Sequence, residues 1–328
     1  MISVVVCHKI GDFIRKCVAS IKKSIGVKYE IIVVTDDGDL RIEGVTMIHD
    51  HSGPALKRNI GAHFANGEYL AFFDDDTEVE IDCLFQMKSA LESKNVGMVY
   101  SKLLTMGTNN FDDAGSYLGS WGFLIERSNN VADIGQFDKY TPILAGKSAS
   151  CMIRRDVFDQ VEGFDVDFFM FGEETDLSWR IWLAGYKVLF APYAVTYHAF
   201  NTPLKDVKKH YSEKTVHYHG CKNYITMLIK NLETHNLLRI LPRHLLVWTL
   251  VALIFVLTGE FTKAKFTFQG IAYNFRYFPT VWRKRLHINA HIRAKKDKDI
   301  WKHIFSRTSF RYYVNRFMTY IRQGRSRK

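Results

Sequence analysis

The sequence predicts an α/β protein, in which a doubly wound, mainly parallel sheet is followed by a helical region. Over residues 1–200, apolar runs of about five residues alternate with segments of helical spacing, as in parallel sheets whose strands are linked by helices. After Pro203 the segments are amphipathic and richer in Lys and Arg. The 328 residues are 47% hydrophobic and 24% charged, a composition that excludes general disorder. We therefore expect a sheet-containing domain over 1–203 and a helical region over 204–328.

The expected elements follow this alternation along the chain. Strands are predicted, from continuous apolar runs, at 2–7, 30–35, 45–48, 69–73, 96–100 and 187–190. Helices are predicted, from apolar residues three and four apart, at 13–25, 53–64, 83–93, 177–182 and 204–232. Residues 105–145 lack a clear period, and we expect them to form loops that cross a cleft before order returns at 148–155.

Positive charge is concentrated at one end of the chain. Residues 281–328 contain 15 Lys and Arg against two acids, a net charge of +13, whereas the other 280 residues carry −2 of the overall +11. Residues 245–258 form an uncharged apolar run, shorter than the roughly 20 residues of a spanning helix. Pro242, Arg243, His244 and Glu260 limit its extension. We expect helices that lie in a membrane interface and contact an anionic surface, the alternative being a helical subdomain with a solvated basic face.

The N-terminus and the cysteines predict a reducing compartment. MISVVVCHK lacks the basic start, longer apolar core and cleavage site of a secretory signal. The five cysteines are odd in number and form no CxxC pair, so neither a disulfide framework nor a zinc site is indicated. We expect a cytoplasmic protein that associates peripherally with the inner face of the cell membrane.

Two acidic clusters follow predicted strands. FFDDDTEV places Asp74, Asp75 and Asp76 at a strand end. Because residues i and i+2 of an extended segment point the same way, Asp74 and Asp76 can face one site and hold Mn²⁺ or Mg²⁺. EIIVVTDDG places Asp36 and Asp37 where parallel sheets bind ligands, and these acids can contact a nucleobase or ribose. For each cluster the alternative is a solvated acidic turn.

A third acidic cluster, GEETDLSWR, stands at a predicted helix start. Glu173, Glu174 or Asp176 could serve as a general base whose pKa is raised by the neighbouring acids. The helix dipole alone also favours acids at this place. His198 follows a strand and could bind a metal as a neutral imidazole, or be structural.

In their order along the chain, these motifs resemble the family 2 glycosyltransferases, which have the GT-A fold. The similarity covers about residues 2–200 in five blocks, among them GPALKRNIGAHFANGEYLAFFDDD and GFDVDFFMFGEETDLSWRIWLAGYKVLF. The resemblance assigns nucleotide-sugar binding to Asp36, Asp37, Arg58, Asp74 and Asp75. It assigns metal binding to Asp74, Asp76 and His198. It assigns the base to the pair Glu173 and Glu174, and Asp176 stays a candidate from its place in the acidic cluster.

This sequence departs from the family pattern at two places. Cys7 and His8 replace a usual small polar pair after the first strand. Glu174 stands where the family usually has Asp, so the choice between Glu173 and Glu174 as the base stays open.

The resemblance implies a metal-dependent, inverting hexosyltransferase that is rhamnosyltransferase-like. It would move a sugar from a UDP- or dTDP-sugar to a hydroxyl of a glycan or polyprenyl-linked acceptor, in cell-surface polysaccharide or glycoconjugate synthesis. One alternative is a nucleotidyltransferase or other nucleotide-sugar enzyme, although CHKIGDFIRK has a single Gly where a phosphate loop needs several. Others are a lectin-like module and a nucleic-acid-binding protein that uses the basic tail. The acidic face argues against the last, and we expect no nucleic-acid partner.

Overall fold

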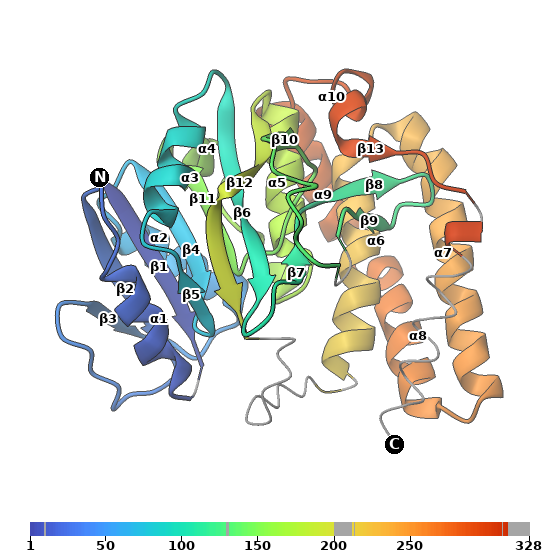
Figure 1. The fold of residues 1–328 in the computed structure, drawn as a ribbon. Helices are drawn as coiled ribbons and strands as arrows, with labels where there is room; N and C mark the ends of the chain where they lie inside the picture. Colours follow the sequence, from blue (N-terminus) through green and yellow to red (C-terminus); the bar gives the residue numbers. More distant parts are fainter. Residues whose placement is uncertain (10, 129–130, 200–211, 213, 310, 314–328) are drawn as a thin grey trace.

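The computed structural model describes residues 1–328 except 10, 129–130, 200–211, 213, 310 and 314–328 (Figure 1). In this described part, a ten-stranded, mainly parallel sheet lies beside a C-terminal group of helices, which confirms the predicted fold class. The strands of the sheet, in spatial order, are β10 (Thr141–Pro142), β12 (Lys187–His198), β6 (Val96–Thr105), β11 (Ser150–Arg154), β4 (Tyr69–Asp74), β1 (Ile2–His8), β2 (Tyr29–Thr35) and β3 (Thr46–His49). Two short strands join this path, β5 (Thr77–Val79) at β12 and β7 (Phe111–Asp113) at β6.

The sheet has helices on both faces because its central strands are apolar on both sides. In β1, Val4 and Val6 belong to one hydrophobic cluster, and Val5 between them belongs to the other. The Val4 side is covered by α1 (Phe13–Ile21) and α3 (Cys83–Leu91). The Val5 side is covered by α2 (Pro54–Phe64), α4 (Arg155–Gln160) and α5 (Glu173–Ala184). The parallel strands β1, β2 and β4 end at the same edge, so the acids that follow β2 and β4 meet there.

The expectation of loops over 105–145 is wrong in part. Strand β6 continues to Thr105, and β7, β8 (Ser116–Gly119), β9 (Leu124–Glu126) and β10 follow it. Strands of two to four residues are too short to show a period of two. The strand predicted at 187–190 is also longer than expected, because β12 extends to His198. Its register to β6 shifts between Ala191 and Val195, and this irregularity accommodates Pro192.

The C-terminal helices pack against the same side of the sheet as α5 (Figure 1). They are α6 (Gly220–Asn231), α7 (Thr234–Leu257), α8 (Phe261–Arg276), α9 (Phe278–His287) and α10 (Asp297–Ile304). One hydrophobic cluster includes Leu177 and Ile181 of α5 together with Ile225 and Leu228 of α6. The predicted helix over 204–232 begins outside the described residues, and the boundary at 203 stays a prediction.

The apolar run 245–258 is not a short isolated segment. It forms most of the second half of α7, which is 24 residues long and passes through Pro242. The proline removes a hydrogen bond to the carbonyl of Leu238, and both residues lie on the exposed side of the helix, where water can replace that bond. By length and composition α7 is the one described helix that could cross a membrane, but 33% of its most apolar stretch is buried inside the protein.

Much of the basic region 281–328 is a folded part of the protein. Five of its aliphatic side chains are buried, namely Val281, Ile288, Ile292, Ile300 and Ile304. Lys284 contacts Asp165 and Asp167 at 2.5 and 2.6 Å, which ties α9 to the loop before α5. The last 15 residues of the predicted tail, 314–328, lie outside the described residues.

Candidate active site

The carboxyl ends of β1 and β2 carry an ion pair. Asp36 follows β2 and pairs with Lys57 of α2. The Lys57 ammonium also donates to the backbone carbonyl of His8 at 2.7 Å, which fixes it between the two strands. Asp37 is half-buried, and its backbone N–H donates to Thr35 Oγ1 at 2.9 Å. Both aspartates therefore lie at the sheet edge where a ligand is expected.

Three candidate metal ligands come together beside this edge. Each of Asp74, Asp76 and His198 offers one ligand atom, and these atoms lie within 4.8 Å of one another. The pairing of β5 with β12 places His198 opposite Thr77. Because Thr77 directly follows Asp76 in the sequence, His198 lies close to Asp76. The distance from His198 Nε2 to Asp76 Oδ1 is 3.3 Å. Two carboxylates and an imidazole suit Mn²⁺, so the donor set fits a divalent cation.

A further acid, Asp112 of β7, orients the histidine. Its Oδ2 lies 2.8 Å from His198 Nδ1, and its Oδ1 accepts from Lys147 Nζ at 2.7 Å. Although burial opposes ionisation, His198 and Lys147 hold the pKa of Asp112 well below its usual range. Burial also opposes a charged imidazole, yet Asp112 and Asp76 raise the pKa of His198 to about 9. Carboxylates of this kind fix the ring of metal-binding histidines, with the other nitrogen left for the metal.

Arg58 of α2 connects the metal ligands to the acids of α5. Its guanidinium donates to Asp74 Oδ1 at 2.9 Å and to Glu173 Oε1 at 2.7 Å. Burial opposes the charge, but these two carboxylates raise the pKa of Arg58 above its usual value. Asp74 at the end of β4 and Glu173 at the start of α5 are therefore joined through one guanidinium group.

Glu173 and Glu174 differ in electrostatic environment. Glu173 is buried, and its Oε1 lies 2.7 Å from the guanidinium of Arg58. Burial, followed by the charge of Glu173, raises the pKa of Glu174 well above the usual range of a glutamate. A raised pKa makes Glu174, when it is ionised, a stronger base than an ordinary glutamate.

Two of the predicted site residues have other surroundings. Asp176 is fully buried and accepts hydrogen bonds from Arg180, Lys230 and Asn231, at 3.0, 2.9 and 2.8 Å. It joins α5 to α6 and does not line the cleft described below. Asp75 lies at the surface, where it accepts from the backbone N–H of Lys9 at 3.4 Å.

A cleft of about 330 Å³ is lined by half of the ten predicted site residues, whereas Asp36, Asp37, Asp75, Asp76 and Asp176 do not line it. Its wall includes Arg58, Asp74, Glu173, Glu174 and His198. On its other side are β9 and α6, represented by Leu124, Glu126, Asn223, Tyr224 and Met227. The helical region is therefore part of the cleft wall.

Asn223 of α6 holds the loop that leads into α5. Its amide nitrogen lies 2.7 to 3.0 Å from three backbone carbonyls within 168–171. This loop has three residues in the left-handed region, Phe169, Phe171 and Gly172, with φ of 63°, 67° and 83°. For the two phenylalanines this backbone conformation is unfavourable, and the amide contacts stabilise it. The hydrogen bonds from Asn223 therefore hold the backbone just before Glu173 and Glu174, the first two residues of α5.

Comparison with known proteins identifies the domain. The sequence profile described as Glycosyl transferase family 2 matches residues 3–162. The chain carries a family 2 glycosyltransferase domain. This domain contains most of the acids discussed above, whereas Glu173, Glu174 and His198 lie beyond the matched residues.

The family 2 domain is also similar to named glycosyltransferases. The chain is 27% identical over 174 residues to the pre-mycofactocin glycosyltransferase of Mycobacterium tuberculosis, covering 48% of this chain and 33% of that protein. It is 29% identical over 158 residues to the O-antigen biosynthesis protein RfbC of Myxococcus xanthus, covering 46% of this chain and 12% of that protein. The matches thus span a third or less of these relatives.

Solved structures share the fold at low identity. GalNAc-T7 with UDP, GalNAc and Mn²⁺ aligns with a TM-score of 0.55 and 18% identity, over 70% of this chain and 47% of that one. S. aureus TarS aligns with a TM-score of 0.50 and 15% identity, over 74% of this chain and 43% of the TarS chain. The family 2 domain therefore has the GT-A fold.

Proposed function

We propose that this chain is a metal-dependent, inverting glycosyltransferase that uses a nucleotide-diphospho-sugar. The observation that carries the proposal is the pairing of Arg58 with both Asp74 and Glu173, at 2.9 and 2.7 Å, in the wall of one cleft. Through this pairing the candidate metal ligands lie next to a candidate base. The reaction requires both groups within reach of one sugar.

The donor side of the cleft would bind the nucleotide and its diphosphate. Asp36 and Asp37, at the end of β2, would accept hydrogen bonds from a nucleobase and a ribose. Asp74, Asp76 and His198 would hold a divalent cation, and its positive charge would offset the negative charge of the leaving diphosphate. Arg58 adds a fixed positive charge beside Asp74. GalNAc-T7, which has the same fold, was solved with UDP and Mn²⁺, and this supports a nucleotide donor and a metal for this chain.

The acceptor side would activate a hydroxyl group. Glu174 accepts the hydroxyl proton while the oxygen attacks the anomeric carbon from the face opposite the diphosphate, so the configuration is inverted in one displacement. Arg58 pairs with Glu173, and burial together with the charge of Glu173 raises the pKa of Glu174. The acceptor would enter between β9 and α6, past Leu124 and Tyr224.

We further propose a glycan or polyprenyl-linked acceptor and a role in cell-surface polysaccharide or glycoconjugate synthesis. The name of the Myxococcus relative, an O-antigen biosynthesis protein, supports this pathway. Peripheral attachment to the inner face of the cell membrane would bring the cleft to such an acceptor. The donor sugar is proposed to be a UDP- or dTDP-linked hexose.

A panel of nucleotide sugars with and without Mn²⁺ tests the donor and the metal. The protein should gain thermal stability with one donor, and more so with Mn²⁺ present. Asp76→Asn should abolish the Mn²⁺-dependent part of this gain, whereas Glu68→Gln, a change at an exposed carboxylate, should leave it unchanged. If no nucleotide sugar stabilises the wild-type protein, the proposal is wrong.

The base is tested by the pair Glu174→Gln and Glu173→Gln. We expect Glu174→Gln to bind donor normally and to lose at least about a hundredfold in kcat, as expected for a missing general base. Glu173→Gln breaks the pair with Arg58 and should reduce both donor binding and turnover. Normal turnover by Glu174→Gln would assign the base to Glu173.

A further inference from the structure

The exposed face of the α7–α8 hairpin has no partner within the described chain, and we propose that it docks on an anionic lipid bilayer. The inference rests on the proposed function only for the acceptor, because a membrane surface is where a lipid-linked acceptor would be met. The α7–α8 hairpin makes this contact, and it lies in the membrane interface without crossing the bilayer.

The first observation is a continuous apolar stripe on the solvent side of α7. Leu246, Leu250, Leu253 and Leu257 are four and three residues apart, so they share one side of the helix, and each is at least 46% exposed. Buried residues occupy the opposite side of α7, where it packs on the protein. The stripe is therefore a second apolar face, beyond the one that the fold requires.

The stripe continues into α8 around the tip of the hairpin. Phe261, Phe268 and Phe275 lie seven residues apart on the exposed side of α8. At the tip, Leu257 is the most exposed side chain of the stripe at 85%, and Phe261 is 67% exposed. Figure 1 shows α7 and α8 side by side at the end of the molecule farthest from β2 and β3.

The second observation is the charge of the hairpin. Residues 234–276 contain five Lys and Arg and a single acid, Glu260, which pairs with Lys263 at 3.3 Å. Arg239, Arg243 and Arg276 are exposed at the end of the hairpin opposite the tip. An exposed apolar stripe flanked by cations matches the interface of a bilayer, in which acyl chains lie beneath anionic headgroups.

The contacts of α7 with the rest of the protein argue for an interfacial helix and against a spanning one. His244 is fully buried and hydrogen-bonded, to the Trp121 carbonyl at 3.0 Å and from Trp248 Nε1 at 2.9 Å. Asn236 donates to Asp297 at 2.8 Å. A helix that crossed a bilayer alone would have to leave these partners, whereas a hairpin lying on the surface keeps them.

Vesicle flotation tests the proposal with the full chain. The probes are phosphatidylcholine vesicles and vesicles that also contain phosphatidylglycerol. We expect the wild-type protein to float with the anionic vesicles and to be released partly by salt. Leu257→Ser with Phe261→Ser should weaken this partition about tenfold, because two exposed anchors are lost. Arg239→Gln with Arg243→Gln should reduce binding to anionic vesicles alone.

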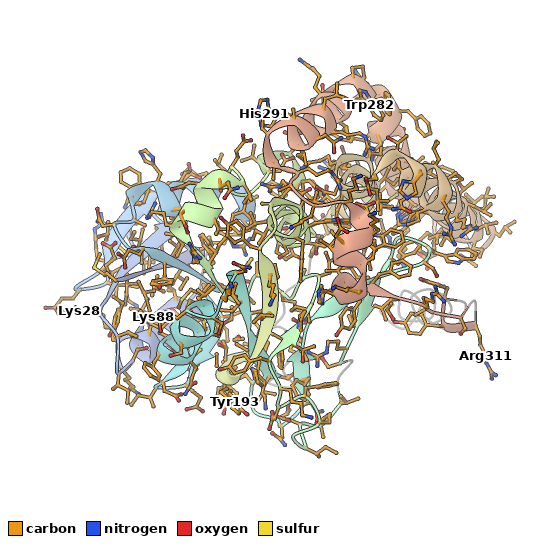
Figure 2. All side chains as sticks on the ribbon, turned by 90° about the horizontal axis from the view of Figure 1, so that it is seen from above. Lys28, Lys88, Tyr193, Trp282, His291 and Arg311 are labelled. Atoms are coloured by element: carbon orange, nitrogen blue, oxygen red, sulfur yellow. The ribbon has the colours of Figure 1, made fainter. Side chains whose placement is uncertain are left out.

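Matched controls lie on the family 2 domain. Phe64→Ser with Ile134→Ser removes two apolar side chains of similar exposure, 55% and 83%, and should leave flotation unchanged. Lys28→Gln with Lys94→Gln removes two exposed cations of the family 2 domain and is the control for the arginine variant. Figure 2 shows Lys28 at the far end of the molecule from the helical region. Flotation of the tip variant at the wild-type level, or no flotation of the wild type, would overturn the proposal.

Two further measurements keep the outcomes distinct. If light scattering finds a dimer that the tip substitutions dissociate without changing flotation, the face is an interface between copies and the proposal is wrong. Donor binding should be the same in all four variants. A loss of flotation with intact donor binding therefore supports membrane docking, and absent donor binding in every protein counts against the glycosyltransferase proposal alone.

Discussion

Two adjacent aspartates in β7 show how strongly the fold controls ionisation. Asp112 faces His198 and Lys147, which hold its pKa well below the usual range despite burial. Asp113 points to the other side of the strand, where burial raises its pKa to about 6 although the backbone N–H of Lys147 donates to it at 3.1 Å. The first carboxylate contacts a candidate metal ligand, whereas the second lines the cleft, and burial disfavours its ionised form.

Asp112→Asn should weaken Mn²⁺ binding about tenfold, because the ring of His198 loses the charge that orients it. Calorimetric titration of the metal, in the absence of any sugar donor, measures this directly. The neighbouring Asp113→Asn is the matched control and should bind Mn²⁺ normally. Equal metal affinity in the two variants would show that Asp112 has no part in the site.

Asp113→Asn should instead stabilise the protein at neutral pH. An acid with a raised pKa binds its proton more tightly in the folded chain, so it favours folding below its unfolded pKa of 3.8, and this advantage is lost as the pH rises through about 6. Above that pH the charged carboxyl costs up to about 3 kcal/mol. The variant should therefore gain a few degrees in Tm at pH 7.5 and almost nothing at pH 4, as measured by calorimetry.

Individual residues were predictable from the sequence where local geometry decides. Asp74 and Asp76 could be placed on one side because strand residues alternate, and His198 could be named as a metal ligand by resemblance. Asp112 could not be singled out, although its string FDDAG was visible, because the pairing of β7 with β6 that brings it to His198 has no local signal. Asn223 was missed for the same reason, since its partners are more than 50 residues away.

At the scale of elements, α6 and the loop before α5 form one functional unit. Besides Asn223, Lys222 contacts the backbone carbonyl of Asp167, and Lys230 reaches Asp165 and Asp176. These contacts connect the helical region to the helix that begins with Glu173. A change in α6 should therefore be felt at the carboxylates of the cleft.

Asn223→Ala should lower kcat at least about tenfold and leave donor binding largely intact, since the loop relaxes from its left-handed conformation and the acids move. Thr226→Ala is the matched control, because Thr226 is buried one turn along α6 and bonds Asn274 at 2.8 Å, away from the loop. Both variants should lose stability by a similar amount. If kcat falls equally in both, Asn223 has only a structural role.

The elements themselves were predicted well where they are long and apolar. The strands at 2–7, 30–35 and 69–73 correspond to β1, β2 and β4 within a residue or two. The prediction failed where a rule about proline was applied too strictly. Pro242 was expected to limit the extension of the apolar run 245–258, but it lies inside α7 on the solvent-facing side of the helix.

The whole molecule uses its basic C-terminal region in more than one way. Composition alone predicted a surface for anionic partners, yet Arg285 donates to the carbonyl of Ile229 at 2.6 Å inside the protein. Arg293 also contacts Asp297 at 3.0 Å. Net charge could not reveal this division, because buried and exposed cations count equally in a sequence.

Deletion of 281–328 should therefore unfold the protein and abolish donor binding together with any membrane contact. It removes five buried aliphatic side chains, each contributing about 1.5–3 kcal/mol, which is comparable to the whole stability of a domain. A chain that ends at Tyr313 keeps every one of them and should retain its Tm and donor affinity. Circular dichroism melting and donor titration compare the two truncations. A 281–328 deletion that melts like the full chain and binds donor would mean that the helices from α9 onward do not support the cleft.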